Sequence, residues 1–137
     1  VGVDRRLLPG ERIEDILAAL RARLAGLGLS DRGLSFEVDS PMDMPGFETP
    51  AGHRLVTVVD GAAGSAGRPS MPLAGWTAAC DGGFVAAQWA LPVVVFGPGS
   101  VNEQAHRPDE SVGIDELVTA ARTYALIVMR LLGSRLP

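Results

Sequence analysis

The chain has 137 residues, enough for one ordinary domain or two small lobes, and 47% hydrophobic against 20% charged residues exclude wholesale disorder. The net charge is −4, and the twelve basic residues, all arginines, are scattered, so neither a nucleic-acid partner nor a basic binding face is expected. The single cysteine, Cys80, excludes an intrachain disulfide, and no apolar run is long enough for a signal peptide or a membrane span, which predicts a soluble, cytoplasmic protein with no membrane partner.

The first part of the sequence predicts a strand, a helix and a second strand. Residues 1–8 are read as a short strand. Apolar residues at helical spacing over 11–25, with acids in the first turn and arginines in the last, predict an amphipathic helix. Alternation over 34–38 predicts a half-buried strand. The proline- and glycine-rich stretch 41–52 is read as a linker, so the expected lobes are residues 1–45 and 46–137.

The second part predicts alternating helices and strands, with Asp81 as the cap of one helix. The expected helices are 53–66, 82–89 and 114–132, and the expected strands are 73–79 and 91–96, the last of them buried. The final helix carries an apolar stripe made by Ile114, Leu117, Val118, Ala121, Ala125, Val128 and Leu132. Because helices and strands alternate, the fold class predicted from the sequence is α/β.

The segment from Phe96 to Glu110 carries the chemistry. A Gly97-Pro98-Gly99 turn, which allows close backbone approach to a ligand, follows the expected strand, and His106 lies on the loop after it. An imidazole there can ligate a metal or move a proton, but a lone surface histidine is the simpler interpretation of His106 by itself. One histidine cannot complete a metal site.

Two signals in this chain resemble a known family. Residues 76–81, the strand into Phe96-Gly97-Pro98-Gly99, the run 105–112 and the closing helix are similar to the C-terminal end of the zinc-dependent amidohydrolases and exopeptidases that include acetylornithine deacetylase and succinyl-diaminopimelate desuccinylase. Residues 4–11, Asp-Arg-Arg-Leu-Leu-Pro-Gly-Glu, resemble the third strand and following helix of that family's lid domain. Their order and spacing fit, and the resemblance spans nearly the whole chain.

The resemblance implies a two-metal zinc site, with cobalt or manganese as alternatives, between an α/β catalytic domain and half of an α+β lid that forms a homodimer. Metal-bound water then cleaves the amide bond of a small N-acyl amino acid or peptide. His106 matches the last metal ligand, Arg6 matches the lid arginine that grips the substrate carboxylate, and Gly97 and Gly99 line the pocket. Without the resemblance, Arg6 beside Asp4 is equally a surface ion pair.

The family's other ligands and its catalytic glutamate should all precede this segment, and none is found in the sequence. The chain is therefore expected to be the C-terminal portion of such a hydrolase, inactive alone, and no catalytic residue is expected in it. The alternative is a non-catalytic binding or dimerisation module derived from the fold. Because an apolar face would stay uncovered, we expect the isolated chain to self-associate.

Overall fold

The computed structural model describes residues 1–69 and 72–133, which form two compact units. Unit 1 comprises residues 1–48 and 77–93, and unit 2 comprises residues 49–76 and 94–137. The chain therefore passes three times between the units, whereas the sequence suggested a single boundary near residue 45. That lobe boundary stays a prediction.

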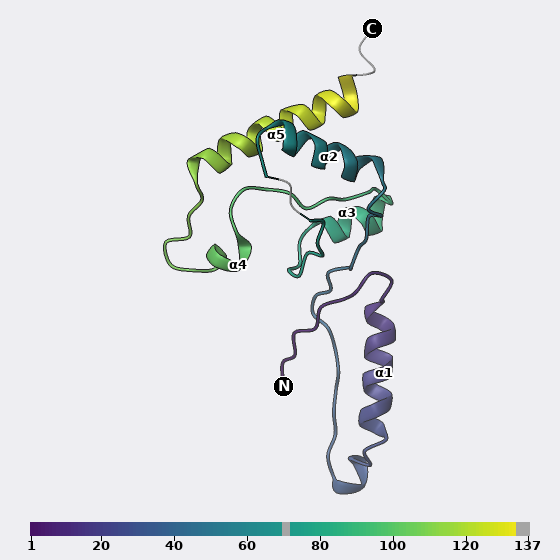
Figure 1. Ribbon diagram of the computed structural model, residues 1–137. Coiled ribbons are helices and arrows are strands. Elements are labelled where there is room, and N and C mark those ends of the chain that lie inside the picture. The colour runs from purple at the N-terminus through teal and green to yellow at the C-terminus, as the bar shows by residue number, and fades with distance from the viewer. Residues whose placement is uncertain (70–71, 134–137) are drawn as a thin grey trace. The chain divides into compact units, whose positions relative to one another are not determined.

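Unit 1 contains two helices and one 3₁₀ turn (Figure 1). Helix α1 spans Ile13–Ala25, η1 spans Ser30–Arg32 and α3 spans Gly82–Trp89. The apolar stripe of α1 is only half-buried, and no residue of that helix is fully buried. An Arg21 guanidinium N–H donates to the Val38 carbonyl oxygen at 2.6 Å, which ties α1 to the extended segment that returns beside it.

Unit 2 is built on one helix pair. Helix α2 spans Arg54–Ser65, α4 spans Val101–Gln104 and α5 spans Ile114–Leu132, and α2 and α5 lie side by side (Figure 1). His53 caps α2, because its Nδ1 accepts the Leu55 backbone N–H at 3.1 Å. The buried core of the unit lies between the two helices and consists of Val56, Val59, Ala62, Ala63, Ala120 and Thr123.

The helices were predicted from the sequence almost to the residue, and the strands were not. Within residues 1–69 and 72–133 the structure contains no β-strand, and the one bridge between extended segments is a parallel pair, Pro9 with Gly46. The two strands of the expected strand–helix–strand lid, 1–8 and 34–38, and the strands 73–79 and 91–96 are therefore corrected to irregular chain, whereas the helix between the first two is present as α1. A strand exists only through hydrogen bonds to a neighbouring strand, whereas a helix satisfies its own backbone.

Two further expectations about packing were wrong. Leu34 and Phe36, expected on a half-buried face, are 51% and 38% exposed, and Leu91 and Val95 of the expected buried strand are 52% and 39% exposed. Asp81 occupies the N-cap position of α3, but its side chain makes no capping hydrogen bond. Its backbone is already helical at φ −61°, ψ −13°, whereas a capping side chain usually belongs to an extended residue.

The apolar stripe of α5 is real, but it faces away from α2. The large stripe residues are 40% exposed or more, whereas the face against α2 carries the small residues Ala120 and Thr123. Small side chains on both helices allow α2 and α5 to pack closely, so the bulkier residues remain on the outer face. None of the described helices is both long enough and apolar enough for a transmembrane segment.

Candidate functional site

The Gly-Pro-Gly turn of unit 2 is held at its first end by Phe96. The Tyr124 hydroxyl of α5 donates to the Phe96 carbonyl oxygen at 2.8 Å, and the two rings meet edge to face with centroids 5.7 Å apart. Gly97 is half-buried, and Gly99 has a φ of +79°, a conformation that side chains with a Cβ rarely adopt. The turn is therefore anchored to α5, and its glycines keep its surface open.

A pocket of about 360 Å³ lies against this turn, entirely within unit 2. The pocket includes both predicted glycines, residues of the loop that follows α2 and residues from the start of α5; its lining is Gly67, Arg68, Pro69, Phe96, Gly97, Pro98, Gly99, Asp115, Glu116, Thr119 and Ala120. Arg68 was not anticipated from the sequence, since it precedes the turn by 29 positions within a loop that carries no motif. Its guanidinium carbon lies 4.8 Å from the centre of the Phe96 ring.

His106 lies on the loop between α4 and α5 and is exposed. Its backbone is left-handed, with φ +61°, and its N–H donates to Glu110 Oε2 at 3.3 Å. A non-glycine residue held in this conformation costs about 1 kcal/mol, and such positions concentrate at functional sites. His106 does not line the pocket beside the turn, and its role as a metal ligand stays a prediction.

The described residues do not form a metal centre by themselves. No group of three or more histidine, cysteine, aspartate or glutamate side chains lies close enough together, in the part of the chain that the structure describes, to hold a metal ion. A zinc site needs three or four protein ligands, and the hydrogen bond described between His106 and Glu110 joins the carboxylate to the backbone N–H of His106 and not to its imidazole ring. A single imidazole is too few ligands to hold a zinc ion, so His106 alone does not fit a zinc site.

Arg6, the other predicted substrate residue, lies in unit 1 and is exposed. Its nearest charged partner is Asp4, at 3.4 Å, and both side chains are largely in solvent. The preceding arginine is engaged differently: Arg5 donates two hydrogen bonds to Glu11, at 3.0 and 2.7 Å. Of the two arginines, Arg6 is the one whose planar fork remains available to a second carboxylate.

Glu11 and Arg5 shift each other's pKa. The hydrogen bonds from Arg5, followed by one from the Leu8 backbone N–H at 2.8 Å, lower the pKa of Glu11, and the bonds to Glu11 raise the pKa of Arg5. Arg5 is exposed and Glu11 is partly exposed, so solvent weakens the pair, which fixes the turn before α1 locally and contributes modestly to stability.

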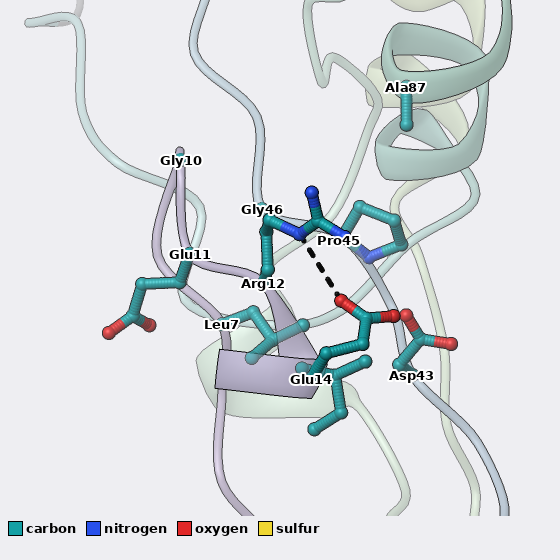
Figure 2. Close-up of a pocket in the computed structure, with 10 residues that line it drawn as sticks. Leu7, Gly10, Glu11, Arg12, Glu14, Asp43, Pro45, Gly46 and Ala87 are labelled. Carbon is teal, nitrogen blue, oxygen red and sulfur yellow. Dashed lines mark hydrogen bonds and ion pairs between the residues drawn. The ribbon is translucent and has the colours of Figure 1, made fainter. Parts of the chain in front are cut away.

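A second pocket, of about 300 Å³, lies in unit 1 beside this turn, and Figure 2 shows it. Arg12 and Glu14 project into it and are joined by an ion pair of 3.3 Å, and the Asp43 carboxylate lies on the same side (Figure 2). A hydrogen bond from its own backbone N–H and the bond from Arg12 lower the pKa of Glu14. Within the lining Arg12 is paired with Glu14, and Glu11 is paired with Arg5, so the only cation that lines this pocket in the described chain is already engaged.

Comparison with known proteins gives a consistent family. The family model described as "Peptidase family M20/M25/M40" matches residues 6–130. The curated relatives include an acetylornithine deacetylase of Pectobacterium atrosepticum, 32% identical over 110 residues, and one of Erwinia tasmaniensis, 34% identical over 110 residues. In each case the match covers 80% of this chain and 26% of the relative. No solved structure matches the chain significantly.

The chain spans about a quarter of the length of the curated relatives it matches. The matched region includes Arg6, the Gly-Pro-Gly turn and His106. A match over nearly all of the residues is far more than a shared motif. The chain therefore belongs to the M20/M25/M40 peptidase family.

Proposed function

We propose that this chain forms part of a metal-dependent hydrolase that cleaves the amide bond of small N-acyl amino acids or peptides. The observation that carries the proposal is the family match over residues 6–130, supported by relatives that are named acetylornithine deacetylases. Zinc is the proposed metal, with cobalt or manganese as alternatives. We further propose that the whole enzyme is cytoplasmic, forms a homodimer through its lid, and has neither a nucleic-acid nor a membrane partner.

Three elements of the chain would contribute to that site. His106 would supply one metal ligand, and its left-handed backbone, tied to Glu110, supports a fixed loop geometry. Arg6 would bind the substrate carboxylate, since its guanidinium is held by Asp4 only at 3.4 Å. Gly97 and Gly99 would form the wall of the pocket. The described residues provide no further cluster of ligands, so the remaining donors must come from outside them, and the isolated chain should be inactive.

A chimera tests the proposal. The segment of the Pectobacterium atrosepticum enzyme that matches this chain is replaced by the chain itself, and hydrolysis of an N-acetyl amino acid is measured with zinc present. We expect activity in the chimera, at least a 100-fold loss of kcat/KM in His106→Ala, and a raised KM in Arg6→Gln. Matched controls are His53→Asn, which keeps a capping acceptor, and Arg5→Gln.

Two outcomes would refute this assignment. Full activity in the His106→Ala chimera would exclude the imidazole as a ligand, and an unchanged KM in Arg6→Gln would exclude the carboxylate contact. Circular dichroism of each variant shows whether loss of activity reflects unfolding. Because the catalytic groups lie elsewhere, activity in the isolated 137-residue chain would contradict the proposal as well.

The outer face of α5 favours a second candidate, a non-catalytic binding or dimerisation module. Seven large apolar side chains on this helix are 43% exposed or more; they are Ile114, Leu117, Val118, Tyr124, Val128, Met129 and Leu132. A face of this kind is typical of a protein–protein contact. A folded chimera that stays inactive with zinc, while the isolated chain associates through α5, would favour this module over the hydrolase.

A further inference from the structure

The pocket beside the Gly-Pro-Gly turn contains an arginine that is oriented but not neutralised. Arg68 is half-buried and stacks over the Phe96 ring at 4.8 Å, and Tyr124 in turn fixes Phe96. In the described ranges no carboxylate lies within ion-pair distance of Arg68. Stacking occupies the face of a guanidinium and leaves its N–H groups, which lie in the plane, free to pair with a carboxylate.

The opposite charge lies at the start of α5. Asp115 and Glu116 line the same pocket, and the Glu116 Oε2 atom accepts the Gly113 backbone N–H at 3.3 Å. That bond orients the Glu116 side chain and leaves its other oxygen available. The Asp115 carboxylate is exposed and pairs with no cation among residues 1–69 and 72–133. These acids could therefore accept hydrogen bonds from a ligand's ammonium group.

The Arg68 guanidinium and the Asp115 and Glu116 carboxylates do not form an ion pair with each other in the described chain. About 360 Å³ of space lies in the pocket that all three line. A Cβ added at Gly97 would meet no atom within 4 Å, so the space beside the turn is open. An open pocket with fixed groups of both signs suits a small molecule that carries both charges itself.

We propose that this pocket binds a free α-amino acid as its zwitterion, with Arg68 holding the carboxylate and Asp115 and Glu116 holding the ammonium group. The choice of an amino acid rests on the proposed function, because hydrolysis of an N-acyl amino acid releases one. Binding of the product in its charged form would also distinguish it from the acylated substrate, whose nitrogen carries no charge.

The experiment titrates the complete 137-residue chain with L-alanine and follows backbone amide resonances by NMR. Three probes separate the charges: L-alanine has both, N-acetyl-L-alanine has only the carboxylate, and L-alanine amide has only the ammonium. We expect saturable shifts at Gly97, Gly99 and Thr119 with L-alanine, and affinity at least about tenfold weaker for each singly charged probe. Equal affinity for either singly charged probe, or no saturable shifts, would overturn the proposal.

Variants assign each charge to its residues. Arg68→Gln should lower the affinity for L-alanine and for N-acetyl-L-alanine about tenfold or more, and leave that for L-alanine amide unchanged. The double variant Asp115→Asn/Glu116→Gln should show the reverse selectivity. The matched control is Arg122→Gln, which removes an α5 arginine that does not line the pocket. Equal weakening for all three probes would overturn the assignment.

The binding experiment does not depend on enzymatic activity, and a folding defect in one variant does not decide its outcome. If Arg68→Gln alters the circular dichroism spectrum, the probe series on the parent chain still decides whether both charges are required. Neither metal nor hydrolysis enters the titration. Failure of the chimera to hydrolyse would therefore refute the proposed function without affecting this result, and absence of L-alanine binding would refute the zwitterion pocket while the hydrolase proposal stands.

Discussion

The outer face of α5 should cause reversible self-association, and Val128→Glu should abolish it. The seven large apolar residues of that face carry no charge among them, and Val128, which lies within the stripe, is 55% exposed. A glutamate there would place a charge inside any contact through the face, where it would lose hydration without gaining a partner. The variant changes neither the face toward α2 nor the length of the helix.

The magnitude follows from the exposed area. Fully burying a side chain of this type is worth about 1.5–3 kcal/mol, so the half that remains exposed is worth roughly 1 kcal/mol per residue. A symmetric pair of helices offers the stripe twice, and burial of half of that area would give about 7 kcal/mol. Association itself costs at least about 4 kcal/mol, which leaves at most about 3 kcal/mol and a dissociation constant of roughly 6 mM.

Sedimentation velocity over a concentration series from about 0.1 to 3 mM measures this directly, since the upper end approaches the dissociation constant of about 6 mM and a substantial fraction of dimer is expected there. We expect a monomer at the low end, a concentration-dependent rise in sedimentation coefficient at the high end, and no rise in Val128→Glu. The matched control is Thr57→Glu, which adds the same charge on an exposed position of α2. Association that persists in Val128→Glu, or a monomer at every concentration, would refute the reasoning.

Three further predictions concern stability. Gly83→Ala should destabilise unit 1 by about 1–3 kcal/mol in urea unfolding, because a Cβ there would overlap the Pro45 carbonyl, whereas Gly2→Ala, which has open space, should not. The stabilising contribution of Glu11 is present above its usual pKa of 4.5 and is lost as the pH falls through its lowered folded value. Glu11→Gln should therefore flatten the pH dependence of the free energy of unfolding below about pH 4.5. The same pH dependence in the variant and the parent chain would contradict this. Thr123→Val should change the free energy of unfolding by no more than about 0.5 kcal/mol, since the Thr123 hydroxyl donates only to a carbonyl of its own helix. Thr123→Ala, which removes buried volume as well, should cost about 1–2 kcal/mol in thermal melts. An equal cost for both variants would show that the hydroxyl matters more than the volume.

The sequence was a good guide to helices because a helix is a local structure. Predicted ranges 82–89 and 114–132 agree with the observed bounds, and 11–25 and 53–66 differ by one or two residues at their ends. The short helix α4 was missed, since four residues carry no periodicity. The predicted strands failed for the opposite reason: their hydrogen-bond partners are specified elsewhere, and in the described chain only Pro9 and Gly46 bridge two extended segments.

The candidate site was predictable only where a motif marks it. The two glycines of the turn were singled out by the Gly-Pro-Gly motif, and both line a pocket, although their role in binding a substrate stays a prediction. Arg68 could not be found in this way, because its relation to Phe96 arises when α2 packs on α5 and brings the end of one helix beside the turn before the other. The positions of Arg6 and His106 relative to a ligand depend on groups outside the described residues, so their roles remain predictions.

Helix α5 carries different kinds of side chain on its two faces. The most buried residues of its inner face, which packs on α2, are small, with Ala120 and Thr123 at 5% and 0% exposure. Its outer face is made of large ones, including Ile114 at 78% exposure. A solvent-facing helix would carry charge on one side, whereas a helix that is apolar on both sides is suited to a position between two layers.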